Sequence, residues 1–376
     1  MSEVKKSSRN GKIELYRFIV SIYVLLFHFY KYLMQPVELT DNYEFGFFLH
    51  GAMGVEFFFL VSGWLMAASV KKSINPDENG IVRFKPEDGL SFMKRKYLSI
   101  FPKHIIAFII SFEVVVICND IEMRDLPMAF INSIPNILLV QNTGLSISEP
   151  NHVEWYLSAM LIAMAVLYPI LVKHYDAYTK YIGPLIALLL CGYMTYTDES
   201  LTGVFIWTGI CFKSVMRAIA EISLGFTAYE ISSYMSRKQY TASKRWLFTA
   251  AEFGSFALAT LYVVSTLPIK YEFFCLAFLF ITVTLAFSGV SHGSRILSNK
   301  LCFFLGKLSL PIYLSQVAAI NITLRYYGNR SENSKIMTAI MFTVLFSALI
   351  MPADLIVNNL LFGKDKEDKK NEKKQG

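Results

Sequence analysis

Hydrophobic residues occur in long blocks along this chain, separated by short polar segments. The blocks are roughly 18–25 residues long, and a helix needs about 20 apolar residues to cross a hydrocarbon core of about 30 Å. Core helices of soluble proteins keep a polar face, which these blocks lack. The pattern therefore predicts an all-α, polytopic transmembrane helix bundle of about ten spans, at residues 15–34, 46–70, 98–118, 154–173, 180–196, 213–235, 246–266, 271–290, 301–324 and 336–361.

The positions of the basic residues predict how this bundle is oriented. Cytoplasmic loops of membrane proteins carry an excess of lysine and arginine. With a cytoplasmic N-terminus, most of the 36 basic residues fall on the cytoplasmic side, in segments 1–12, 71–97, 173–180, 236–245, 291–300 and 362–376. Both termini are therefore expected in the cytoplasm. We attribute the net charge of +7 to topology rather than to nucleic-acid binding.

The same pattern divides the chain into a cytoplasmic tail (1–12), a transmembrane domain (13–362) and a highly charged cytoplasmic tail (363–376). The first span carries Arg17 and His28 and does not end in a small-residue cleavage site. We expect it to be a retained span and not a cleaved signal peptide. The protein is thus predicted to be a multi-pass cell-membrane protein, in a bacterial inner or plasma membrane.

The long external segment 119–153 contains apolar residues at a spacing of four, which is typical of one face of a helix. They are Leu126, Phe130, Ile134 and Leu138. We expect an interfacial helix that lies on the outer membrane face and is kinked or ended by Pro135.

The five cysteines lie in or beside hydrophobic blocks and show no paired spacing. Neither a metal site nor a disulfide framework is expected from them. Packing as small apolar residues is the favoured interpretation.

Ionisable residues in the first two spans indicate a site, because charges inside a membrane are costly. Arg17 lies one turn after Glu14, and the two can pair. His28 is eleven residues further on, about 16 Å along a helix, and a neutral imidazole can take and return a proton. Glu56 lies at a similar depth in the second span. We predict that it pairs with His28 and fixes its tautomer, although a lone histidine in a span more often serves packing.

A third cluster, MKRKYLSIFPKH at 93–104, is strongly basic. Lys94, Arg95 and Lys96 are expected at the cytoplasmic interface, with Lys103 and His104 about two turns deeper. Such a cluster of basic residues at the cytoplasmic end of a helix bundle would suit a phosphate-rich cytosolic ligand. The alternative is a simple interfacial anchor.

Five blocks occur in an order that is similar to a known family. They are Arg17-x10-His28, GVEFFFLVSGW (54–64), the start of the third span, where basic residues are followed by Ile-x-Pro, WYLSAMLIAMAVLYPIL (155–171) and LGKLSLPIYLSQ (305–316). Together they resemble the acyltransferase-3 family of integral-membrane O-acyltransferases, and the resemblance covers nearly the whole chain.

The resemblance implies transfer of an acyl group, usually acetyl, from cytosolic acyl-CoA to a hydroxyl of a cell-surface or lipid-linked glycan. It implies acetyl-CoA as the donor, with membrane lipid as a further partner and with no metal and no nucleic acid. By this resemblance the catalytic residues would be His28 and Glu56. The residues that hold the donor would be Arg17, Arg95, Lys96 and Lys103.

The chain also departs from the family pattern. The second arginine of the usual Arg-x-x-Arg is Ser99, the usual histidine of the fifth block is Gln316, and a common glutamate in the fourth is Met160. The missing arginine leaves open a family-like scaffold with degraded activity. A transporter or flippase of lipid-linked glycans, with buried charges along a pathway, is the other alternative.

Overall fold

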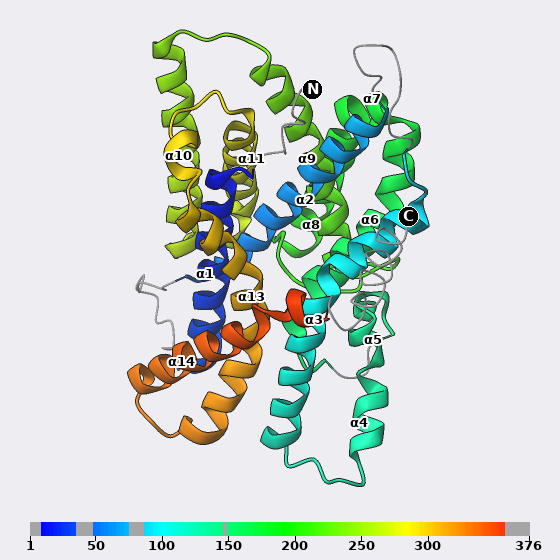
Figure 1. Cartoon of the computed structure of the whole chain (residues 1–376), viewed down its shortest axis with the longest axis vertical. Helices are drawn as coiled ribbons and strands as arrows, with labels where there is room; N and C mark the ends of the chain where they lie inside the picture. The colour runs from blue at the N-terminus through cyan, green and yellow to red at the C-terminus, as the bar shows by residue number, and fades with distance from the viewer. Residues whose placement is uncertain (1–8, 35–47, 75–85, 146–148, 358–376) are drawn as a thin grey trace, which may run out of the picture.

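The computed structural model describes residues 9–34, 48–74, 86–145 and 149–357, and within them the chain forms helices and connecting loops (Figure 1). The long helices are α1 (Gly11–Leu33), α2 (Gly54–Ile74), α3 (Gly89–Cys118), α6 (Trp155–Lys173), α8 (Gly183–Asp198), α9 (Lys213–Ser236), α10 (Ala242–Val264), α11 (Glu272–Ser288), α13 (Lys300–Tyr327) and α14 (Glu332–Ile350). The fold is the predicted all-α bundle. The predicted tail at 363–376 lies outside the described residues.

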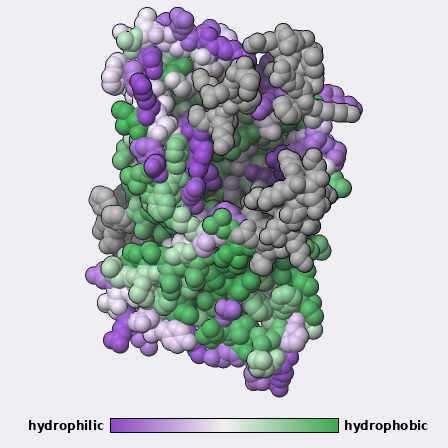
Figure 2. Space-filling view, viewed as in Figure 1, coloured by the Kyte–Doolittle hydropathy of each residue, from purple (hydrophilic) through white to green (hydrophobic). Residues whose placement is uncertain are grey.

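Eight segments in the described part are long and apolar enough to cross a membrane. Of the ten predicted spans, those at 180–196 and 213–235 correspond to α8 and α9, which are not among the eight. The helix α8 has 16 residues, and α9 carries four charged residues, Lys213, Arg217, Glu221 and Glu230. Figure 2 shows hydrophobic residues across the central and lower part of one face, with hydrophilic residues gathered at the two ends. The total of ten spans and the cytoplasmic termini stay predictions.

Glycines set two of the closest helix contacts. A Cβ atom on Gly63 of α2 would lie 2.1 Å from the carbonyl oxygen of Ile222 in α9, and one on Gly225 would lie 2.4 Å from that of Leu60. Small residues of this kind let helix backbones approach closely in membranes. As a result, α2 and α9 pack with their backbones in contact.

The second close contact joins α1 to α13. A Cβ atom on Gly306 would lie 2.0 Å from a carboxylate oxygen of Glu14. The two helices run in the same direction, since Glu14 meets Gly306 and, further along, His28 meets Gln316. This packing brings the first and the fifth sequence blocks together.

The segment between α3 and α6 runs back along α3 (Figure 1). The short helices α4 (Leu126–Asn132) and α5 (Ile134–Ile137) rise beside the lower part of α3 (Figure 1). The carbonyl of Ile137 accepts hydrogen bonds from Tyr97 (2.9 Å) and His104 (3.1 Å), both well inside α3. The expected break near Pro135 is confirmed, because α4 ends at Asn132 and α5 begins at Ile134. The expected position on the outer membrane face stays a prediction. The chain folds back along α3, because buried partners there satisfy its backbone.

Candidate active site

Gln316 fixes the orientation of the His28 ring. The Nδ1 atom of His28 lies 3.1 Å from Oε1 of Gln316, and Nε2 of Gln316 donates to the carbonyl of Tyr313 at 2.9 Å. A carbonyl oxygen can only accept, so the amide nitrogen must face Tyr313 and the amide oxygen must face the ring. Nδ1 of His28 is then the donor in this contact. Its Nε2 atom is left with a lone pair, which is the form of a base or nucleophile.

Three further rings surround His28. Tyr32 stacks on it with centroids 6.1 Å apart, and Phe27 meets it edge-on at 5.0 Å. His152 lies 6.1 Å away at a steep angle. This second histidine belongs to the 3-10 turn η3 (His152–Glu154), which leads directly into α6. The imidazole of His28 is thus held by packing as well as by its hydrogen bond.

The predicted partnership of Glu56 with His28 is wrong. Glu56 accepts a 2.5 Å hydrogen bond from Arg217 of α9, and both side chains are buried. The glycine contact between α2 and α9 places the two side chains together, and the Arg217 guanidinium also lies 5.1 Å from the centroid of the Trp155 ring. A charge buried in the bundle needs such a partner.

Glu221 lies one turn after Arg217 on α9, but Arg217 donates to Glu56 and not to Glu221. Both carboxylate oxygens of Glu221 are buried and have no hydrogen-bond partner.

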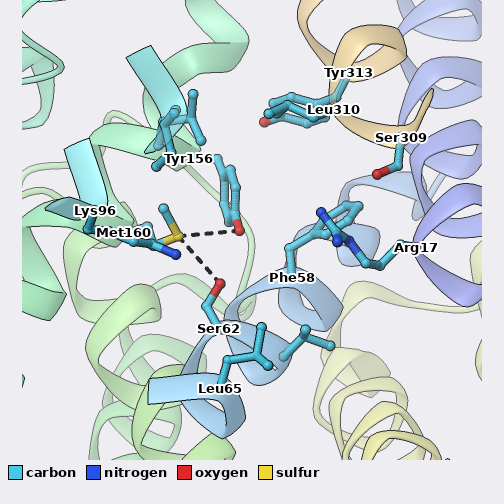
Figure 3. A pocket seen from close by; sticks show the side chains of 13 residues that line it. Arg17, Phe58, Ser62, Leu65, Lys96, Tyr156, Met160, Ser309, Leu310 and Tyr313 are labelled. Carbon is cyan, nitrogen blue, oxygen red and sulfur yellow. Dashed lines mark hydrogen bonds between the residues drawn. The ribbon is translucent and has the colours of Figure 1, made fainter. Parts of the chain in front are cut away.

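Arg17 and Lys96 face each other across a cavity of about 250 Å³ (Figure 3). Arg17 enters from α1 and Lys96 from α3, and their positive charges repel one another. The predicted pairing of Arg17 with Glu14 is confirmed at 3.6 Å. Phosphate oxygens would suit this cavity, because they would pair with both cations at once.

Aliphatic and aromatic side chains, together with Ser62 and Ser309, line the rest of the cavity. Met160, which replaces a common glutamate of the family, accepts from Ser62 at 3.4 Å and from Tyr156 at 3.6 Å through its sulfur atom (Figure 3). The other lining residues are Phe58, Val61, Leu65, Ile100, Leu157, Ser309, Leu310 and Tyr313.

The other two predicted donor residues do not line this cavity. Arg95 is more than half exposed and pairs with Glu87. Lys103 pairs with Asp354, which follows α14. Each therefore pairs with an acidic residue that does not line the cavity, whereas Lys96 and Arg17, which also pairs with Glu14, line the cavity itself.

His104 and Glu154 form a buried pair of their own. Nδ1 of His104 lies 2.9 Å from the Glu154 carboxylate, and its Nε2 lies 3.1 Å from the carbonyl of Ile137. Both ring nitrogens have hydrogen-bond partners, so His104 connects the segment that contains Ile137 to Glu154, the residue before α6.

An aromatic cluster connects the basic cavity to His28. Phe58, Tyr156 and Tyr313 lie with ring centroids 5.9–6.5 Å from one another. Tyr313 lines the cavity with its side chain, and its carbonyl holds Gln316. Tyr313 of α13 therefore links the cavity lining to the residue that orients His28.

This arrangement defines an integral-membrane helical protein with a basic cavity at one end of α1 and an oriented imidazole about three turns further along it. The acyltransferase-3 family model, which describes an acyltransferase domain, matches residues 10–355. The chain belongs to this family and is a membrane acyltransferase. Searches of curated proteins and of solved structures found no match to the chain.

Sequence reasoning missed the role of Gln316. The signal available was the position itself, because a polar side chain ends the LGKLSLPIYLSQ block where the family usually has a histidine. The proximity of His152 to His28 had no signal in sequence spacing, because 124 positions separate them.

Proposed function

We propose that the protein transfers an acetyl group from acetyl-CoA to a hydroxyl of a cell-surface or lipid-linked glycan. The donor would enter from the cytoplasmic side and the acceptor from the outer side of a bacterial plasma membrane. The proposal rests on family membership together with the layout of the site.

One observation carries the proposal. Arg17, which lines the cavity together with Lys96, and the oriented imidazole of His28 are both on α1, about 16 Å apart along its axis. Arg17 and Lys96 would bind the CoA phosphates, and the arginine can form a bidentate pair of hydrogen bonds with a phosphate. The thioester arm would then extend along α1 and α13 towards His28.

His28 supplies the chemistry in this proposal. With Nδ1 held by Gln316, its Nε2 lone pair is directed to act on the acyl group or on the acceptor hydroxyl. A positioned base contributes about 10²–10⁴-fold to rate. Gln316 takes the orienting role that Glu56 was expected to have.

The test is acyl-CoA turnover by purified protein in detergent. Acetyl-CoA is added to the wild type and to His28→Ala, and free CoA is followed with and without crude cell-surface glycan. The proposal expects glycan-stimulated release that the variant loses. Full activity in His28→Ala would refute the role of the histidine.

A binding measurement separates this proposal from the other candidates. No CoA release and no acetyl-CoA binding by calorimetry would contradict the acetyltransferase and favour a transporter or an inactive scaffold. Elution volume and thermal unfolding of each variant should match the wild type, so that loss of activity is not loss of fold.

A further inference from the structure

His152 lies beside His28 at the outer end of the site and has so far no role. Its ring centroid is 6.1 Å from that of His28 and 5.9 Å from that of Tyr32. Its Nε2 atom is buried and forms no hydrogen bond. A buried nitrogen without a hydrogen-bond partner destabilises the folded state by about 1–3 kcal/mol. The fold therefore keeps the His152 ring in this position despite a loss of stability.

The position of His152 is fixed by the helix that also carries Gln316. On one side, Asn151 donates through Nδ2 to the carbonyl of Leu314 at 3.0 Å. On the other, the carbonyl of Val153 accepts from the hydroxyl of Tyr313 at 2.7 Å. Both neighbours of His152 are therefore tied to α13. The two histidines are held in one frame, which is a property of built sites.

The separation of the two rings suits one oxygen atom between them. With centroids 6.1 Å apart, a hydroxyl oxygen can lie within hydrogen-bond distance, about 2.7–3.2 Å, of a nitrogen on each ring. Tyr32 lies beside both rings, with its centroid 6.1 Å from that of His28 and 5.9 Å from that of His152. Lys31, on the same helix, adds a positive charge that acts on both imidazoles.

We propose that His152 is the second catalytic histidine and removes the proton of the acceptor hydroxyl, while Nε2 of His28 carries the acyl group. The inference rests on the proposed function and adds a residue and a reaction order to it. The reason is chemical. Once Nε2 of His28 is acylated and Nδ1 is bonded to Gln316, that ring has no nitrogen left to accept a proton.

The two steps balance as follows. Nε2 of His28 attacks the thioester carbon, the C–S bond breaks, and CoA leaves as a thiolate. His28 is then an N-acylimidazolium that keeps its Nδ1 proton. The acceptor oxygen attacks the same carbon while its proton passes to His152, and the C–N bond breaks to return neutral His28. His152 releases that proton to water, which offsets the proton that the thiolate takes up.

Two assays on the same preparations test this order. Exchange of labelled CoA into acetyl-CoA without glycan reports the first step, and acetyl transfer to glycan reports both. We expect His152→Ala to lose at least about 100-fold in transfer, the low end of what a positioned base contributes, while exchange stays within about threefold of wild type. His28→Ala should lose both. His152→Gln, which keeps size and polarity, should behave like His152→Ala and serves if the alanine variant does not fold.

The matched control is His174→Ala, an exposed histidine at the other end of α6, which should retain both activities. Three outcomes would overturn the inference: transfer by His152→Ala close to wild type, equal loss of exchange and transfer in a stable His152 variant, or transfer without any exchange in the wild type. Absence of both activities in the wild type would instead overturn the proposed function, and the inference with it.

Discussion

The amide of Gln316 holds His28 by its Nδ1 atom, at 3.1 Å, and the orientation of that amide is itself fixed by the carbonyl of Tyr313. A neutral amide thus does here what a carboxylate does in many histidine-based sites. It selects the tautomer without adding a negative charge, which would be costly inside the bundle.

The first prediction concerns this hydrogen bond. Gln316→Leu keeps the volume but removes the acceptor of the Nδ1 proton, so the ring can rotate or change tautomer. We expect kcat to fall roughly 10- to 100-fold, part of what a positioned base contributes, with the KM for acetyl-CoA little changed. Steady-state kinetics in detergent check this. A fall in acetyl-CoA affinity with unchanged kcat would contradict the role.

The second prediction separates the four basic residues that the sequence singled out. Arg17→Ala and Lys96→Ala remove cavity-lining charges, and each should raise the KM for acetyl-CoA about tenfold, equal to about 1.4 kcal/mol. Arg95→Ala and Lys103→Ala remove residues paired elsewhere and should change KM less than about twofold. Isothermal titration with acetyl-CoA gives an independent value. Equal effects in all four variants would mean that the cavity is not the donor site.

A third prediction follows from the buried charges between α2 and α9. Glu56→Gln leaves Arg217 buried without its ion pair and should destabilise the protein by about 3–5 kcal/mol. Glu221→Gln replaces a carboxylate that forms no hydrogen bond and should be neutral or stabilising. Thermal unfolding in the same detergent measures both. The structural role is supported if Glu56→Gln, assayed below its transition, keeps most of its activity per folded molecule.

A fourth prediction tests the helix packing. Gly63→Ala places a Cβ atom 2.1 Å from the Ile222 carbonyl and should lower the unfolding temperature strongly, because backbone atoms must move. Gly254→Ala in α10 is the matched control. Nothing lies within 4 Å of the added atom there, and the better helix propensity of alanine should stabilise by up to about 1 kcal/mol. Similar unfolding temperatures for the two variants would show that α2 and α9 are not packed this closely.

Much of the fold was predictable from local sequence. A span is defined by the length of its apolar block, and eight of the predicted spans correspond to helices that meet this criterion in the described residues. The relation between Arg17 and His28 was also predictable, because both are on one helix and its rise per residue fixes their separation. The return of residues 126–137 along α3 was not, because its apolar stripe fits an interfacial helix equally well.

The sequence by itself determined the class of protein, its helices and the residues that are unusual in a membrane. Only the tertiary structure decided which of these residues meet. Glu56 was the expected partner of His28, but the structure places Gln316 there and pairs Glu56 with Arg217, because the partner depends on how each helix is rotated about its axis. That rotation is set by glycine contacts between helices far apart in the chain, such as Gly63 with Ile222 and Gly306 with Glu14. Apolar block length carries no information about it, because lipid tails are as apolar as the side chains that pack between helices.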